Sequence, residues 1–292
     1  MKTGKLGVWY FFDGMSAQAA AEAALRIESL GYGTLWIPET VGRHPFVHAG
    51  WLLASTSTLN VATGIANIYH REPGVSLAGR NALNEQSGGR FLLGLGVSHR
   101  PIVEGVRGLE YGPPVATMRR YLEAMKNAPY QSIPPAEPPA TVIAALGPKM
   151  LMLAREACDG AHPYFVSPDH TAMAKEILGP ERMLCVEQKI ILEADPGRAR
   201  DLARPVAAMY MDLPNYRNNW LRMGLDESDL ADGGSDRFID ATFAWGDLQA
   251  IQARIRAHFD AGATHVCLQP VNPSGRFGEM HWEALEALAE MA

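Results

Sequence analysis

The sequence has little cysteine and no long hydrophobic run. Its three cysteines, Cys158, Cys185 and Cys267, lie far apart and form no CxxC pair. This spacing is typical of reduced cytosolic thiols, and it argues against a disulfide framework or a zinc knuckle. No stretch of 18 apolar residues occurs, and the N-terminal apolar run is too short for a signal peptide. We therefore expect a cytoplasmic protein with no membrane partner.

The chain also lacks an excess of positive charge. Lys and Arg total 26 against 32 Asp and Glu, which gives a net charge of -6. Nonspecific binding of nucleic acid depends on neutralising phosphates, so we expect no nucleic-acid partner. By contrast, apolar residues make up 47% of the 292 residues, which is enough to form a large core.

Common catalytic and metal-binding motifs are missing as well. There is no HExxH pattern and no GxSxG nucleophile elbow, which removes the strongest signs of a zinc protease and a serine hydrolase. His44 and His48 are spaced to meet on one helix face, but no carboxylate cluster accompanies them. We expect two surface histidines at the start of a helix and no metal site.

Short apolar runs alternate with longer helical patterns along the chain. The runs cover residues 6–10, 34–37, 59–65, 90–95, 141–145, 160–165, 183–192 and 264–269. They are continuous, as in parallel strands covered on both faces. Eight strands with intervening helices fit a doubly wound sheet or a closed barrel, and a doubly wound chain of this length normally shows a linker between two lobes. We predict an α/β fold, a (β/α)8 TIM barrel as a single domain over 1–292, with a helical insertion near 212–235.

Chemistry in such a barrel sits at the carboxyl ends of the strands. Those ends carry aromatic and small residues, a lining that suits a flat aromatic ligand better than a metal or a sugar chain. His99, directly after the fourth strand, is the histidine placed best for acid–base work, although it could be an ordinary loop histidine. Glu39, after the second strand, could act in catalysis, orient a ligand, or pair with Arg43 or Arg71.

The turn Leu146–Gly147–Pro148 is a candidate anion site. Proline at the first helical position leaves free backbone N–H groups and the positive end of the helix dipole facing the barrel mouth. Such a turn suits a cofactor phosphate, and an ordinary strand-to-helix turn is the alternative.

Longer motifs carry a family resemblance over essentially the whole chain. They are GYGTLWIPE (31–39), LNVATGIANIYHREP (59–73), NEQSGGRFLLGLGVSH (84–99), AALGPKMLMLAREACDGAHPYFVSP (144–168) and AGATHVCLQP (261–270). Together they resemble the bacterial luciferase-like monooxygenase superfamily, and most of all its branch that uses the deazaflavin coenzyme F420. The segment LPNYRNNWLRMG (213–224) is similar to one subfamily of deazaflavin-dependent oxidoreductases.

The resemblance implies a tricyclic cofactor ring lying across the carboxyl-terminal mouth of the barrel. It implies a non-proline cis peptide bond at Gly64–Ile65, which forms a bulge against the ring. The other positions that match cofactor-binding positions of the family are Glu39, Val97 and Ser98 beside the ring, and Leu146, Gly147, Pro148 and Ser167 at the phosphate.

One departure concerns the substrate. Family members that oxidise alcohols or sugar phosphates carry an Asp-His pair where this chain has Glu39-Thr40. The imidazole is missing, which puts that substrate class in doubt. His99 is then the first candidate for proton transfer, with Glu39 as the second catalytic candidate and His70 as a weaker replacement.

We therefore expect an F420-dependent oxidoreductase that transfers a hydride between the cofactor and a small organic substrate. The candidate substrate pocket consists of Trp9, Phe12, Tyr69, His70 and Tyr111. An FMN-dependent monooxygenase served by a separate reductase, or a non-catalytic flavin-binding protein, is the alternative. The resemblance also implies a homodimer.

Overall fold

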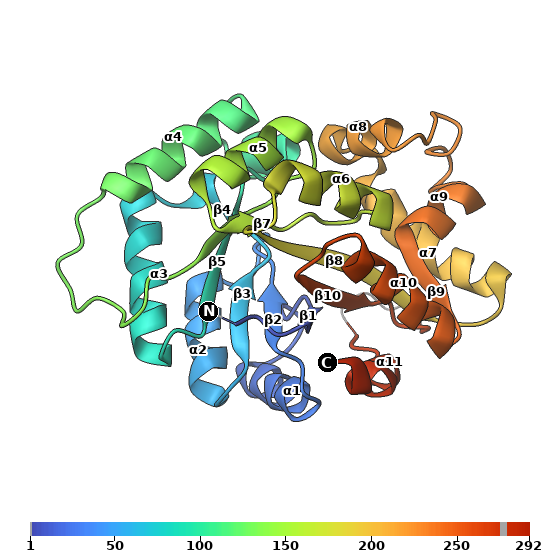
Figure 1. Cartoon of the computed structure of the whole chain (residues 1–292), viewed down its shortest axis with the longest axis horizontal. Coiled ribbons are helices and arrows are strands. Elements are labelled where there is room, and N and C mark those ends of the chain that lie inside the picture. Colours follow the sequence, from blue (N-terminus) through green and yellow to red (C-terminus); the bar gives the residue numbers. More distant parts are fainter. Residues whose placement is uncertain (1, 275–278) are drawn as a thin grey trace.

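A closed parallel barrel forms the centre of the molecule. The computed structural model describes residues 2–274 and 279–292. Eight strands follow one another in the order β10-β1-β2-β3-β5-β6-β7-β8, and β8 pairs with β10 to close the ring (Figure 1). Their bounds are β1 Leu6–Trp9, β2 Thr34–Ile37, β3 Asn60–Thr63, β5 Phe91–Gly96, β6 Thr141–Ile143, β7 Gly160–Ala161, β8 Met183–Leu192 and β10 His265–Pro270. Each falls on one of the eight apolar runs, so the predicted barrel is confirmed.

Two short strands were not predicted. β4 (Ala66–Asn67) pairs with the end of β5, and β9 (Phe243–Gly246) pairs with the carboxyl-terminal half of β8. β9 lies outside the closed ring, because β8 completes the ring by pairing with β10. β4 follows β3 in the chain and pairs with the same strand, β5.

Helices surround the ring as expected for parallel strands with crossover connections. They are α1 Ala17–Ser29, α2 Pro45–Ser55, α3 Pro73–Ser87, α4 Pro114–Asn127, α5 Pro148–Ala157, α6 Pro168–Leu178, α7 Pro196–Met211, α10 Leu248–Asp260 and α11 Trp282–Leu288. None of the helices within 2–274 and 279–292 is both long and apolar enough to cross a membrane. The single-domain expectation for 1–292 stays a prediction, since residues 1 and 275–278 lie outside the described part.

Large side chains fill the barrel interior. Trp36 is fully buried there, and its Nε1 donates to Nε2 of His265 at 2.9 Å. Gly7 leaves the room for this pair, because a Cβ at that position would lie 2.6 Å from the same Nε2. On β8, Cys185 belongs to the interior core, whereas Leu184 belongs to the outer core between strands and helices. The alternation of side chains along each strand thus builds two separate cores.

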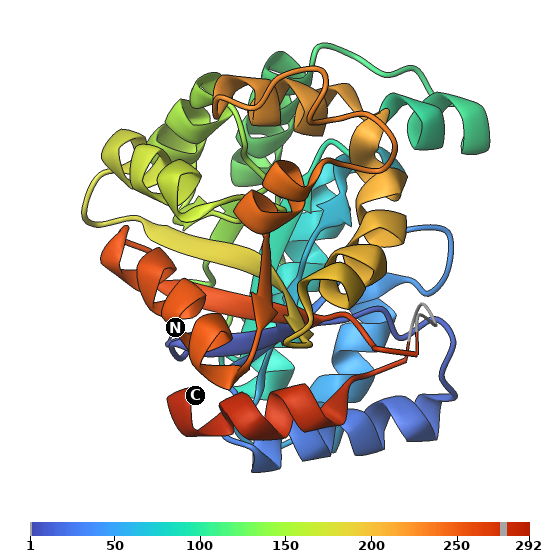
Figure 2. The same ribbon diagram turned by 90° about the vertical axis from the view of Figure 1, so that its right-hand side faces the viewer.

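The interior core continues into the predicted insertion. Within 212–235 the chain forms α8 (Pro214–Arg222) followed by turns, and α9 (Asp236–Thr242) comes next, so the expected helical insertion is confirmed. Tyr216 and Trp220 belong to the same buried cluster as Trp9, and Trp220 Nε1 donates to the carbonyl oxygen of Phe165 at 3.2 Å. Figures 1 and 2 both show α8 beside α5. The insertion therefore packs onto the carboxyl-terminal end of the barrel.

One expectation about histidine was wrong. His44 is exposed and caps α2, but His48 is buried, with its ring centroid 5.4 Å from that of Phe12. His44 is the N-cap of α2 and has an extended backbone, so it lies outside the helix, and the i, i+4 spacing does not place it on the same face as His48. The three cysteines are buried and free.

Candidate functional site

A bulge follows β3 at the barrel mouth. The Gly64–Ile65 peptide bond is cis, as the resemblance implied. Trp9 Nε1 donates to the carbonyl oxygen of Gly64 at 3.0 Å, and the N–H of Glu39 donates to that of Ile65 at 3.2 Å. A Cβ on Gly64 would lie 2.6 Å from Trp9 Nε1, so only glycine allows this contact. The ends of β1 and β2 therefore hold the bulge on both sides.

Glu39 anchors the segment that follows the bulge. Its carboxylate accepts hydrogen bonds from the N–H of Asn67 at 2.7 Å, from Nδ1 of His70 at 3.0 Å and from the Arg71 guanidinium. Burial raises the pKa of Glu39, but Arg71, Asn67 and His70 outweigh it and the pKa lies below its usual value. The carboxylate is thus ionised and fully engaged, which favours a positioning role over that of a free acid or base.

The structure also chooses between the two possible ion-pair partners of Glu39. Arg71 makes the pair, while the N–H of Arg43 donates to Asp13 at 2.9 Å and its guanidinium donates to the carbonyl oxygen of Met15. His70 is held on its other side as well, since its Nε2 lies 3.0 Å from Nδ2 of Asn67.

The end of β5 brings three partly exposed candidates to the mouth, Val97, Ser98 and His99. Ser98 has a left-handed φ of 53°, and Tyr111 donates to its carbonyl oxygen at 3.3 Å. Tyr111 stacks on Tyr69 with ring centroids 5.6 Å apart. The two predicted pocket tyrosines therefore form one pair beside the β5 loop.

His99 lies between the β5 loop and the insertion. Its ring centroid is 5.6 Å from that of Tyr216 in α8. Burial lowers the pKa of His99, and a hydrogen bond with Asn215 opposes the shift without cancelling it. The imidazole is consequently neutral at pH 7 and able to accept a proton.

A chain of aromatic rings crosses the mouth. The ring centroids of Trp9 and Tyr164 are 5.1 Å apart, those of Tyr164 and Tyr210 5.6 Å, and those of Tyr210 and Tyr216 5.1 Å. The Tyr164 hydroxyl lies 2.8 Å from both the Tyr210 hydroxyl and Gln269 Oε1. Phe12 does not join this group; it packs with Tyr10 and His48 in the outer core.

A buried ion pair lies under these rings, and it is not among the residues predicted from the sequence. Lys189 Nζ is 3.1 Å from Glu187 Oε2, and both side chains are completely buried. The Nζ atom also lies 3.8 Å and 3.9 Å from the ring centroids of Tyr164 and Phe165. Burial lowers the pKa of Lys189 to about 8, with Glu187 opposing the shift. The sequence does contain an indication of this pair, because two charged residues that are two positions apart in a buried strand point to the same face.

The third part of the site is the pair of helix starts at α5 and α6. Gly147, the N-cap of α5, has no side chain to cap the first turn, whereas Ser167 caps α6 through the N–H of His170. Nε2 of His170 lies 2.8 Å from the carbonyl oxygen of Leu146, which joins the two starts. The Arg222 guanidinium of α8 faces the same turn, 3.8 Å from where a Cβ of Gly147 would stand. Backbone N–H groups with a nearby guanidinium are the donors that a phosphate requires.

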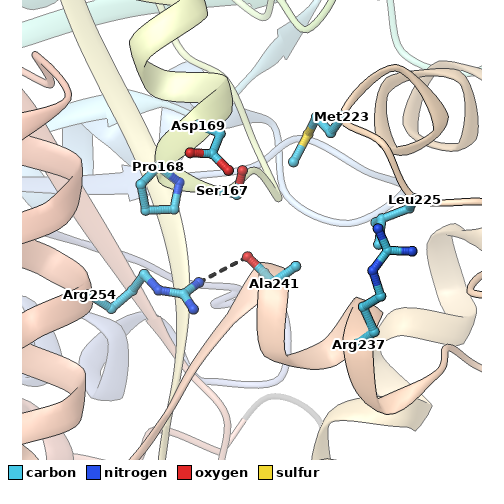
Figure 3. Close-up of a pocket in the computed structure, with 8 residues that line it drawn as sticks. All are labelled: Ser167, Pro168, Asp169, Met223, Leu225, Arg237, Ala241 and Arg254. Atoms are coloured by element: carbon cyan, nitrogen blue, oxygen red, sulfur yellow. Dashed lines mark hydrogen bonds between the residues drawn. The ribbon is translucent and has the colours of Figure 1, made fainter.

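A cavity of about 340 Å³ opens beside the start of α6 (Figure 3). Its lining residues are Ser167, Pro168, Asp169, Met223, Leu225, Arg237, Ala241 and Arg254. Ser167 is the only one of these that the sequence singled out. In the described residues, no group of three or more His, Cys, Asp or Glu side chains is arranged to hold a metal ion.

Comparison with known proteins finds related sequences and structures. A model of the luciferase-like monooxygenase family matches residues 4–265. A Mycobacterium tuberculosis protein named as a coenzyme F420-dependent oxidoreductase is 28% identical, over 90% of this chain and 93% of its own.

Two solved structures are similar in fold. An F420-dependent secondary alcohol dehydrogenase, in complex with an F420-acetone adduct, has a TM-score of 0.78 at 16% identity and covers 100% of this chain and 98% of its own. The coenzyme F420-dependent tetrahydromethanopterin reductase of Methanopyrus kandleri has a TM-score of 0.78 at 18% identity, covering 99% and 98%. At these identities the similarity is one of fold.

Proposed function

The chain belongs to the luciferase-like monooxygenase family, and from this we propose that it is a coenzyme F420-dependent oxidoreductase acting on a small organic substrate. The observation that carries the proposal is the relative named for F420, whose similarity extends over nine-tenths of both chains. The donor set around Gly147, which fits a phosphate, supports it independently.

We propose that the ring of the cofactor lies against the bulge at Gly64 and Ile65, flanked by Glu39, Val97 and Ser98. Leu146, Gly147, Pro148 and Ser167 would hold its phosphate. The fixed position of the bulge, with both carbonyl groups bonded to neighbouring strands, supports the first part. When bound, the deazaflavin supplies a hydride carrier.

The chain's own residues would orient the reactants and handle the proton. Glu39, ionised and bonded three ways, holds the segment after the bulge and so acts as a positioning residue. The rings from Trp9 to Tyr216 keep water away from the reacting atoms. His99 is the group that exchanges a proton with the substrate, because its imidazole is neutral and partly exposed. Tyr69, His70 and Tyr111 would wall the substrate pocket with Trp9.

The assignment is tested by titrating the purified chain with oxidised F420 and, separately, with oxidised FMN, following the fluorescence of each ring. We expect F420 to bind with a dissociation constant in the micromolar range or below, and FMN to bind at least about tenfold more weakly. Tighter binding of FMN would support the monooxygenase alternative. Binding of neither would remove the redox assignment.

His99→Asn is expected to lower the turnover number about 100-fold, because general acid–base catalysis contributes 10²–10⁴-fold. Affinity for the cofactor should not change. Turnover is followed as oxidation of reduced F420 across a panel of carbonyl and imine compounds. The matched control is His44→Asn, at an exposed helix cap. If His99→Asn turns over at the wild-type rate, His99 has no part in proton transfer.

We further propose a single-domain protein that works in the cytoplasm as a homodimer. Val47 and Trp51, four apart on α2, are 73% and 47% exposed, an apolar face that a second copy could cover. The buried free thiols are consistent with a reducing compartment. Sedimentation velocity that measures the mass of one chain at micromolar concentration would contradict the dimer.

A further inference from the structure

Arg222 is the last residue of α8 and lies over the start of α5. Its Nη2 and Nη1 atoms are 3.8 Å and 4.0 Å from the point where a Cβ of Gly147 would stand, so glycine leaves an open space between the turn and the guanidinium. The two residues are far apart in sequence, and only the packing of α8 onto the barrel brings them together. Figure 1 shows the two helices side by side.

The guanidinium of Arg222 has no acidic partner in the described part of the chain. Its Nη1 donates to Oδ1 of Asn219, one turn earlier in the same helix, at 3.1 Å. Asn219 is completely buried and therefore fixes the direction of the arginine. Neighbouring arginines are neutralised, since Arg217 in α8 pairs with Glu227 and Arg237 in α9 pairs with Asp229. Arg222 thus keeps its charge free for an anion.

His170 joins the starts of α5 and α6 beside Gly147. His170 is 1% exposed, and its Nε2 is bonded to the carbonyl oxygen of Leu146, while its Nδ1 has no hydrogen-bond partner in the described residues. Burial lowers the pKa of His170 to about 4. The hydrogen bond with the Leu146 carbonyl opposes this shift, and the positive charge of Arg222 adds to the shift. The neutral ring contributes no competing charge. The nearby N–H groups of the first turn of α5 are uncapped by any side chain.

We propose that Arg222 is a cofactor-binding residue, which binds the phosphate of the cofactor together with the start of α5. It thereby selects the phosphorylated cofactor over the same deazaflavin without its phosphate. The proposal rests on the function proposed above. The N–H groups of one guanidinium form a fork that fits two oxygens of a phosphate, and the backbone N–H groups of a helix start are a second set of donors for the same anion. The insertion would then act in cofactor selection as well as covering the mouth.

The test compares two ligands and three variants by fluorescence titration. The ligands are F420 and the deazaflavin ring with its ribityl chain but without phosphate. Arg222→Gln is expected to weaken F420 binding about 10- to 100-fold, the range for losing a charge-assisted hydrogen bond. Binding of the unphosphorylated ring should stay at the wild-type value. Arg222→Lys, which keeps the charge, should recover part of the loss.

The matched control is Arg217→Gln, which removes the same charge from the same helix where Glu227 already neutralises it. It should leave both affinities unchanged. Salt gives a second readout, because screening should weaken F420 binding to the wild type more than to Arg222→Gln. Since Arg222 is exposed, its variants are expected to fold, and far-UV circular dichroism checks this.

The outcomes separate this inference from the function on which it rests. If wild-type protein binds F420 but Arg222→Gln binds it equally well, the role of Arg222 is wrong and the function stands. If Arg222→Gln weakens both ligands equally, Arg222 acts through the fold and the phosphate proposal is wrong. If the wild type does not bind F420 at all, the proposed function itself fails.

Discussion

Lys189→Met is expected to lower the free energy of unfolding by about 3–5 kcal/mol, the range for breaking a buried ion pair from one side. Lys189 and Glu187 are completely buried, and Lys189 is the only cation within ion-pair distance of Glu187 among the described residues. Methionine fills a similar volume but leaves a carboxyl group without its counter-ion inside the barrel. That carboxyl must then take up a proton or remain charged in an apolar core, and either costs stability.

Equilibrium unfolding in urea, followed by circular dichroism, measures the change. The double variant Lys189→Met with Glu187→Gln should recover most of the loss, because glutamine is neutral and its oxygen can still accept the Phe165 N–H, which lies 2.9 Å from Glu187 Oε2. The control Lys126→Met, at an exposed position of α4, should change stability by less than about 0.5 kcal/mol. A loss below about 1 kcal/mol for Lys189→Met would mean that the pair is not buried in solution.

Acid is expected to unfold the protein at about pH 5, because five histidines are buried in the neutral form. These are His48, His162, His170, His258 and His265. Burial is the largest cause in each case, and it lowers the pKa of His258 to about 3 and that of the other four to about 4. His265 shows the reason locally, since its Nε2 accepts from Trp36 and a proton there would meet the indole N–H.

The direction in which stability changes with pH follows from the number of protons that each state binds. Between pH 6.5 and about 4, these histidines are protonated in the unfolded chain but neutral in the folded one. The unfolded state binds more protons, so stability falls as the pH falls, by about 1.4 kcal/mol per pH unit for each histidine at most. The lowered pKa of Glu39 works in the same direction at lower pH. A typical stability of roughly 5–15 kcal/mol would be used up within one or two pH units.

Urea unfolding at several values between pH 7 and pH 5 measures this slope. The variant His44→Gln changes an exposed histidine and should leave the slope as it is. Stability that stays constant between pH 7 and pH 5 would contradict the neutral burial of these five rings.

The site shows what a sequence can and cannot indicate about chemistry. The sequence left two possible partners for Glu39, and packing chose Arg71 because the bulge at Gly64–Ile65 brings the following segment back over β2. Phe12 and Trp9 are three residues apart in one aromatic run, yet they belong to different cores. Trp9 is the last residue of β1, whereas Phe12 lies beyond the strand and is placed by its packing against Tyr10 and His48.

By itself, the sequence determined the eight barrel strands, the insertion and the turn at Gly147, because apolar runs and proline positions act over a few neighbouring residues. Tertiary structure alone decided which distant groups meet. It placed Lys189 and Glu187 beneath Tyr164, joined β9 to β8, and brought Arg222 to Gly147. Such pairings depend on the closure of the barrel and on the way the insertion packs over its mouth, which no local pattern of residues records.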